Sequence, residues 1–196
     1  MKRTSMFAGV ALALLSGLTL GLSGCNDGGV RTVKGDWYAY HQDYLRYAAG
    51  RGPIQTVVRG NAFNNVSPGT FTDTVISEMQ DQPLGVGEVS FEPAEPSDLK
   101  GPVYVSLVFN PESGFGSYDA CRPERVASAG GGPKPGEAAR VVAAFCSTQK
   151  LLSGTEGVVS LSGPNDPKFG ELIRYVMIDL FPLSNPNLGP SCDSCP

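Results

Sequence analysis

The stretch VYVSLVF, residues 103–109, is the clearest strand signal in this sequence. Its odd-numbered positions are all bulky and apolar, so one face of the strand is expected to be buried. The even-numbered positions hold Tyr104, Ser106 and Val108, which form a second, half-covered face. An Asn-Pro pair follows and ends the strand, because proline has no N–H group for a sheet ladder. We therefore place this stretch at the centre of a sheet.

Shorter strand patterns occur on both sides of this stretch. They cover residues 54–60, 88–92 and 138–146, with a fainter pattern at 157–162. Gly, Pro and Asn separate these segments and indicate turns. Strands that alternate in this way usually form antiparallel sheets with one face on the core. We expect an antiparallel sheet of about four strands, covered on one face by helices.

Two amphipathic helices complete the predicted domain. The helix at 68–80 begins after Ser67 and the helix at 167–181 begins after Asp166, each with proline as its first residue. The apolar stripe of the second helix consists of Phe169, Leu172, Ile173, Val176, Met177 and Leu180. Such a stripe must cover a sheet or another helix. The sequence therefore predicts a single α+β domain over residues 36–181, with both helices on one face of the sheet.

An aromatic segment precedes the first of these strands. Asp36 suits an N-cap and Gly50 a C-terminal stop, which predicts an N-terminal aromatic helix over residues 37–49. At helical spacing, one face carries Trp37, Tyr40, His41, Tyr44 and Ala48. Either this face packs on the domain, or it contacts lipid headgroups or a partner protein, since Trp and Tyr favour half-wet positions. The candidate contact residues for the second interpretation are Trp37, Tyr40, Tyr44 and Tyr47.

The first residues of the chain have the pattern of an export signal. Lys2 and Arg3 form a basic start, and residues 6–22 are apolar or small. The run ends in Leu22-Ser23-Gly24-Cys25, which resembles the lipobox of bacterial lipoproteins. That resemblance implies removal of residues 1–24 by the lipoprotein signal peptidase and attachment of diacylglyceryl and further acyl chains, such as palmitate, to Cys25. Two or three acyl chains hold a soluble domain on a membrane far longer than one.

The same resemblance implies a location. The mature chain would be lipid-anchored in the bacterial cell envelope and face the periplasm. In enteric-type bacteria, an Asp directly after the lipidated cysteine resembles the signal for retention in the inner membrane. This chain has Asn26 at that position, so the outer membrane is favoured over the inner. Residues 25–35 then read as a linker between the lipid on Cys25 and the domain. The domain itself resembles no family by its sequence.

The charge of the chain excludes one class of partner. The full sequence has 15 basic and 19 acidic side chains. Without Lys2 and Arg3, the mature chain has 13 against 19, a net charge of −6. An acidic chain without basic runs argues against nucleic-acid binding.

The cysteines predict disulfides in an oxidising compartment. With Cys25 assigned to lipid, four remain: Cys121, Cys146, Cys192 and Cys195. We prefer a Cys121–Cys146 bridge with a local Cys192–Cys195 bridge. In the alternative, the two tail cysteines pair with Cys121 and Cys146. The first bridge would clamp a Gly- and Pro-rich segment, residues 111–137, which reads as a flexible loop. Residues 182–196 read as an irregular Pro-rich tail.

No catalytic constellation is recognisable. The chain has one histidine, His41, and lacks a nucleophile elbow or a phosphate-binding loop motif. The Cys-Asp-Ser-Cys motif at 192–195 has no helix after it, so redox use is disfavoured, and one such pair does not make a metal site. We predict no cofactor and no metal.

Three functions remain as hypotheses. The first is a non-enzymatic interaction or assembly module on the membrane, with an envelope protein as partner. The second is a small-ligand-binding lipoprotein with a pocket between sheet and helices. The third is an enzyme that uses His41 or a free cysteine. An exposed aromatic patch would favour the first, a large pocket with converging polar groups the second, and a free cysteine near His41 the third.

Overall fold

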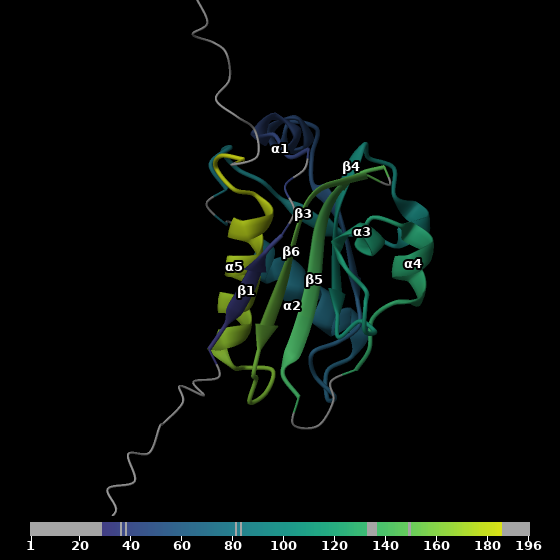
Figure 1. The fold of residues 1–196 in the computed structure, drawn as a ribbon, viewed down its shortest axis with the longest axis vertical. Coiled ribbons are helices and arrows are strands. Elements are labelled where there is room, and N and C mark those ends of the chain that lie inside the picture. The colour runs from purple at the N-terminus through teal and green to yellow at the C-terminus, as the bar shows by residue number, and fades with distance from the viewer. Residues whose placement is uncertain are drawn as a thin grey trace, which may run out of the picture.

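A mixed six-stranded sheet forms the centre of the molecule (Figure 1). The structure is a computed structural model that describes residues 29–35, 37, 39–80, 82, 84–132, 137–148 and 150–185. The strands lie in the order β1-β6-β5-β4-β2-β3. Their bounds are β1 Arg31–Lys34, β2 Ile54–Arg59, β3 Phe91–Pro93, β4 Val103–Phe109, β5 Ala139–Ser147 and β6 Lys150–Val159.

Within the described ranges, the chain forms five α-helices and one 3₁₀ turn, η1 at Pro96–Asp98. The helices are α1 Gln42–Ala49, α2 Pro68–Met79, α3 Ser117–Ala120, α4 Pro123–Ser128 and α5 Pro167–Leu180. The predicted caps are present: the side chains of Ser67 and Asp166 accept hydrogen bonds from the N–H groups of Thr70 and Lys168. The fold is a mixed α/β fold, compatible with the predicted α+β class.

The predicted all-antiparallel sheet of about four strands is wrong in its pairing. β4, β5, β6 and β1 are antiparallel neighbours, but β2 is parallel to both β4 and β3. The physical reason is the route of the chain. α2 carries it from the end of β2 back to the start of β3, and a helical crossover joins parallel strands.

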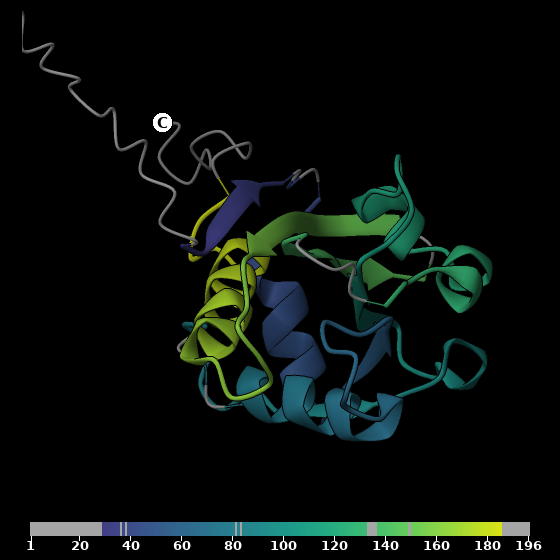
Figure 2. The same cartoon turned by 90° about the horizontal axis from the view of Figure 1, so that it is seen from below.

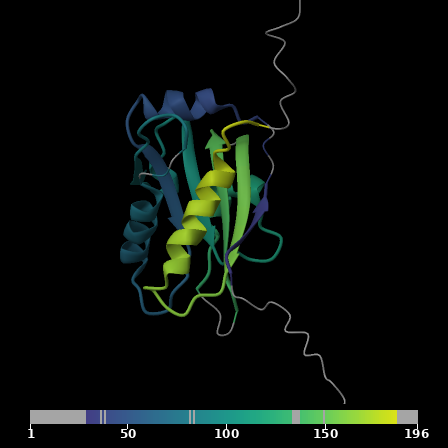
Figure 3. The same cartoon turned by 90° about the vertical axis from the view of Figure 1, so that its left-hand side faces the viewer.

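Helices cover both faces of the sheet. α1, α2 and α5 enclose the larger core, and Figures 2 and 3 show α5 and α2 side by side on that face. The second core lies on the opposite face, where α3 and α4 cover Tyr104, Val108 and Val142. The second face of β4, expected to be half covered, is therefore fully buried. The predicted loop at 111–137 holds α3 and α4, and its residues 133–136 lie outside the described ranges.

β6, at Lys150–Val159, begins earlier and is longer than the predicted 157–162 segment. Two glycines in this strand weaken its pattern in the sequence, but both have packing roles. A Cβ atom at Gly157 would lie 2.6 Å from a methyl carbon of Leu172 on α5. On the other face, a Cβ atom at Gly154 would clash with the side chain of Ser117 in α3, at 2.3 Å from its Cβ atom. Glycine in a strand usually weakens the strand signal, yet it also marks close approach of another element. Here both helices approach β6 at its glycines.

Three other boundaries differ from the sequence-based prediction. Arg31–Lys34 forms β1 beside β6, where we expected linker. α1 begins at Gln42 rather than at 37, with His41 as its N-cap, and the expected cap Asp36 lies outside the described residues. β3 is displaced from 88–92 to Phe91–Pro93.

The two ends of the sheet carry different features. At the lower edge in Figure 1, β1 begins opposite Val158, and β2, β4 and β6 have their carboxyl ends. At the upper edge α1 lies across the strand ends, and the N–H group of Ala39 donates to the carbonyl of Leu152 near the start of β6. The ten residues of β6, spaced by ~3.3 Å each, separate the two edges by about 30 Å.

Candidate functional site

The four candidate contact residues of the aromatic segment do not share one exposed face. Tyr40 is 1% exposed and packs its ring against Phe145 and Phe181. Trp37 is half-buried, and its indole N–H donates to the Asp179 carbonyl at 2.9 Å. Tyr44 and Tyr47 are 43% and 55% exposed. The face predicted to contact lipid or a partner is therefore reduced to Tyr44 and Tyr47.

The late start of α1 explains this division. His41 has extended backbone angles, and its Nδ1 accepts the N–H of Asp43 at 3.2 Å, which caps the helix. Trp37 and Tyr40 therefore precede the helix, and both turn towards the core. From His41 onward, Tyr44, Tyr47 and Arg51 follow at helical spacing and lie along one side of α1.

A shallow groove runs beside this row of side chains. We call it the α1 groove; it has a volume of about 560 Å³. Its lining residues are His41, Asp43, Tyr44, Tyr47, Pro102, Val103 and Ser147. Sequence reasoning identified the two tyrosines but missed Pro102, Val103 and Ser147. These residues lie at the start of β4, with Pro102 directly before it, and at the end of β5, and only the sheet register brings them to α1.

The polar groups at the groove are held by local contacts. Asp43 binds Arg46 at 2.5 Å and lies 3.0 Å from His41 Nδ1. Arg51 lies over the ring of Tyr47, 5.4 Å from its centroid, and donates a hydrogen bond to the Tyr47 hydroxyl at 3.0 Å. Its helical spacing from Tyr47 was the signal that could have identified Arg51. The Tyr47–Arg51 pair forms an aromatic and cationic surface beside the groove, which Tyr47 itself lines.

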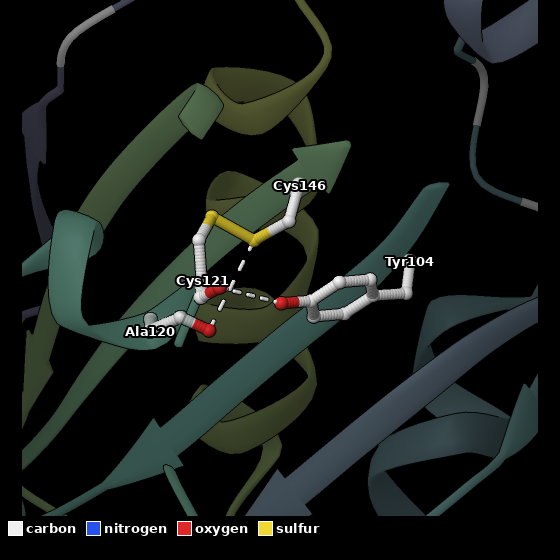
Figure 4. The surroundings of a disulfide bond; sticks show 4 residues. All are labelled: Tyr104, Ala120, Cys121 and Cys146. Atoms are coloured by element: carbon white, nitrogen blue, oxygen red, sulfur yellow. Dashed lines mark hydrogen bonds between the residues drawn. A yellow bond between two sulfur atoms is a disulfide. The ribbon is translucent and has the colours of Figure 1, made fainter. Parts of the chain in front are cut away.

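Within the described residues, His41 does not lie beside a free cysteine. Cys121 and Cys146 form a disulfide, the pairing preferred from the sequence, and both are fully buried between α3 and β5 (Figure 4). The Tyr104 hydroxyl donates to the Cys121 carbonyl at 2.8 Å. Cys25, Cys192 and Cys195 lie outside the described residues. No group of three or more potential metal ligands occurs in the described part of the chain.

Two buried tyrosines have perturbed acidity. Burial raises the pKa of Tyr104 to about 12, with a smaller contribution from the nearby carboxylate of Glu124. Burial also raises the pKa of Tyr40 to about 12, against the opposing charge of Arg46. Both phenols are therefore neutral and structural at physiological pH.

A second hollow lies at the lower edge, with a volume of about 1030 Å³. It faces the carboxyl ends of β2 and β4, where the chain leaves towards opposite faces of the sheet. Ligands often bind at such switch points. Most of its central polar groups are already paired. Asn110, at a φ of 47°, donates to the Asn61 carbonyl and accepts from the Arg140 N–H, and Arg140 binds Glu156 at 2.8 Å.

The glycine-rich segment at 129–132 is part of this lower edge. Gly131 donates to the Phe109 carbonyl and accepts from Asn61, at 3.1 and 3.0 Å. Gly130 has a φ of 91°, and a Cβ atom there would lie 2.5 Å from the nitrogen of Gly60. Glycine is required at this close approach, so these residues close the edge rather than form a flexible loop.

A search for long apolar helices in the described residues finds none of membrane-spanning length. No protein-family model matches the chain, and no curated protein matches its sequence. Among solved structures, two crystal forms of the PelC dodecamer from Paraburkholderia phytofirmans align with it. A single-residue variant aligns with a TM-score of 0.39 and 12% identity, over 79% of this chain and 98% of that chain. The other form gives 0.38 and 13%, over 78% and 96%. Likenesses at this level assign no family and no function to the chain.

Proposed function

We propose that this chain is an envelope lipoprotein, held on a bacterial membrane by lipid on Cys25, whose domain is an interaction or assembly module in the periplasm. The outer membrane remains the favoured location because Asn26 follows the lipidated residue. The observation that carries the interaction role is the α1 groove. Tyr44 and Tyr47 expose about half of their surface beside a cation, and Tyr and Arg are the residues that most often dominate protein interfaces.

The place of this groove in the fold supports an orientation of the domain relative to the proposed lipid anchor. Arg31 is six positions after Cys25, so it lies within about 20 Å of the anchored cysteine whatever the path of the chain between them. Arg31 is at the lower edge, and α1 is at the upper edge, about 30 Å further away. We infer that the lower edge faces the membrane and that the α1 groove faces away from it. Of the interpretations drawn from the sequence, this orientation disfavours contact of the aromatic face with lipid headgroups and favours contact with a partner protein.

Photo-crosslinking in intact cells tests the interaction role. Benzoylphenylalanine is placed at Tyr44 or Tyr47 of the lipidated protein, with Tyr175 as a control because it is 40% exposed on a different helix, α5. We expect discrete protein adducts from Tyr44 and Tyr47 that Tyr175 does not give. The same adducts from Tyr175, or adducts to lipid alone from Tyr44 and Tyr47, would contradict the proposal.

The anchor is tested separately. Metabolic labelling with palmitate is expected to label the wild-type chain, and the Cys25→Ser variant is expected to lose both the label and membrane attachment. A Cys25→Ser variant that keeps the label would refute the lipobox interpretation.

The lower-edge hollow supports a second candidate, a small-ligand-binding lipoprotein. Its exposed lining includes Asn64, Asn65, Ser113 and Ser160, which supply amide and hydroxyl groups for a polar ligand. Native mass spectrometry of protein extracted from membranes would show a bound small molecule that the cavity-filling variant Ser160→Trp lacks. Spectra without any adduct would leave the interaction module as the better account.

A further inference from the structure

The α1 groove continues beyond its tyrosines into a second hollow. This hollow, which we call the Lys100 section, has a volume of about 300 Å³ and shares Pro102 and Val103 with the α1 groove. Its other lining residues are Ala48, Arg51, Gly52, Pro53, Ile54, Gln55, Glu92, Lys100 and Gly101. The two hollows therefore adjoin at Pro102 and Val103, and we call them together the channel, which extends along the upper edge from His41 to Lys100.

One side chain fixes the floor of the Lys100 section. The Gln55 side-chain oxygen accepts the N–H groups of Lys100 and Gly101 at 2.7 and 3.1 Å, and its amide donates to the Asp98 carbonyl at 3.3 Å. Three bonds from a single glutamine hold the loop at 98–101 in place. A binding surface that is already ordered loses less entropy when a partner arrives.

The channel carries a residual positive charge. Arg51 and Lys100 form no ion pair with any residue in the described ranges, and Arg51 is oriented by the ring of Tyr47. Asp43 is already paired with Arg46. Glu92, also exposed along the channel, is the single unpaired acid in its lining. On a chain with a net charge of −4, these two unpaired cations favour a ligand with a carboxylate.

The neighbouring sheet edge does not offer a place for strand addition. β3 is the last strand on this side, and its outward groups at Phe91 are both occupied. The Gln80 side chain donates to the Phe91 carbonyl at 2.8 Å and accepts the Phe91 N–H at 3.2 Å. Pro93 has no N–H group to donate. A partner at this edge must therefore be held by its side chains, not by a backbone ladder.

We propose that the channel binds one extended segment of a partner protein that carries a bulky apolar side chain and, a few residues away, a carboxylate. The apolar side chain lies against Tyr44 and Val103, and the carboxylate lies between Arg51 and Lys100. This rests on the proposed function, since it specifies the partner of the same surface. Anionic lipid headgroups are disfavoured as the occupant because the channel lies at the edge opposite Arg31, the first strand residue after the proposed anchor.

Selection from a random dodecapeptide display library tests this chemistry with the lipidated, full-length mature protein in detergent micelles. We expect enriched peptides to combine an aromatic or large aliphatic residue with Asp or Glu. The double variant Arg51→Gln/Lys100→Gln should bind them about tenfold or more weakly, since charge-assisted hydrogen bonds are lost. The control is Arg125→Gln, which changes a side chain on α4 that pairs with Glu112 and Asp119. This variant should bind the peptides as the wild type does. All three proteins should melt at the same temperature.

Three results would overturn the inference. These are enriched peptides without an acidic residue, equal binding by the double variant, and saturable binding of phosphatidylglycerol vesicles that the double variant loses. If no peptide is enriched while Tyr44 still crosslinks to a protein in cells, the peptide chemistry is wrong and the proposed interaction role stands. If neither is observed, both are wrong.

Discussion

Removal of the Cys121–Cys146 bridge should cost a large part of the stability of the domain. The two cysteines are 25 residues apart and fully buried. In the chain-entropy model, a loop of that length contributes about 3.5 kcal/mol to the free energy of unfolding. For a domain of this size, each kcal/mol shifts the melting temperature by about 2–4 °C, so the Cys121→Ala/Cys146→Ala variant should melt about 7–14 °C lower.

Urea unfolding of the mature protein measures this loss. Wild type and double variant are compared by fluorescence, with and without reductant. The control Cys192→Ser/Cys195→Ser keeps the buried bridge and removes the tail cysteines, so reductant should destabilise it as much as the wild type. Reductant should have no effect on the Cys121→Ala/Cys146→Ala variant. A loss below about 1 kcal/mol, or an equal response of all proteins to reductant, would refute the assignment of the bridge as the main covalent constraint.

Further predictions concern packing and acidity. Gly157→Val should lower the free energy of unfolding by about 1–3 kcal/mol, because its side chain would meet Leu172, and calorimetry showing no loss would contradict the packing of α5 on β6. Leu172→Asp should prevent folding, since this fully buried side chain is part of the main core, and a variant with an unchanged melting temperature would refute that role. Tyr40 and Tyr104 keep their protons in the folded state up to a pKa of about 12, against 10.0 for a free phenol, so their contribution to stability is complete below pH 10 and is lost as pH rises towards 12. Ultraviolet titration of tyrosinate should show both rings ionising last, and ionisation of all seven tyrosines near pH 10 in folded protein would contradict their burial.

The elements with strong periodicity could be predicted from the sequence. The 103–109 strand has its predicted bounds, and the helices at 68–80 and 167–181 end one residue earlier than predicted. In these segments, local pattern and tertiary burial agree. The helix caps could be predicted for the same reason, because the side chains of Ser67 and Asp166 accept hydrogen bonds from N–H groups no more than three residues further along the chain.

The missed elements depend on contacts that local pattern does not record. β1 is a four-residue strand with a cation at each end, and it is stabilised by pairing with β6, more than a hundred residues later. The parallel pairing of β2 follows from the α2 crossover rather than from the residues of β2. Tyr40 and Tyr44 lie on the same face of the predicted helix. The position of the N-cap at His41 decides which of them is buried.

The candidate site shows the same division. Tyr44 and Tyr47 were predicted as contact residues because aromatic side chains at helical spacing stand out in a sequence. The walls of the α1 groove come from Pro102, Val103 and Ser147, which the β4–β5 register places opposite α1. No spacing rule in the sequence joins these residues to the helix.

The orientation of the domain on its membrane can be measured with the native tryptophan, the only one in the chain. Trp37 lies at the α1 edge, bonded to the end of α5. The lipidated protein is incorporated into vesicles whose lipids carry brominated acyl chains, which quench nearby indoles. The reference is the Gly163→Trp variant in a Trp37→Phe background, since position 163 lies at the lower edge with open space around it. We expect quenching of the reference tryptophan and not of Trp37, and equal or stronger quenching of Trp37 would contradict the proposed orientation.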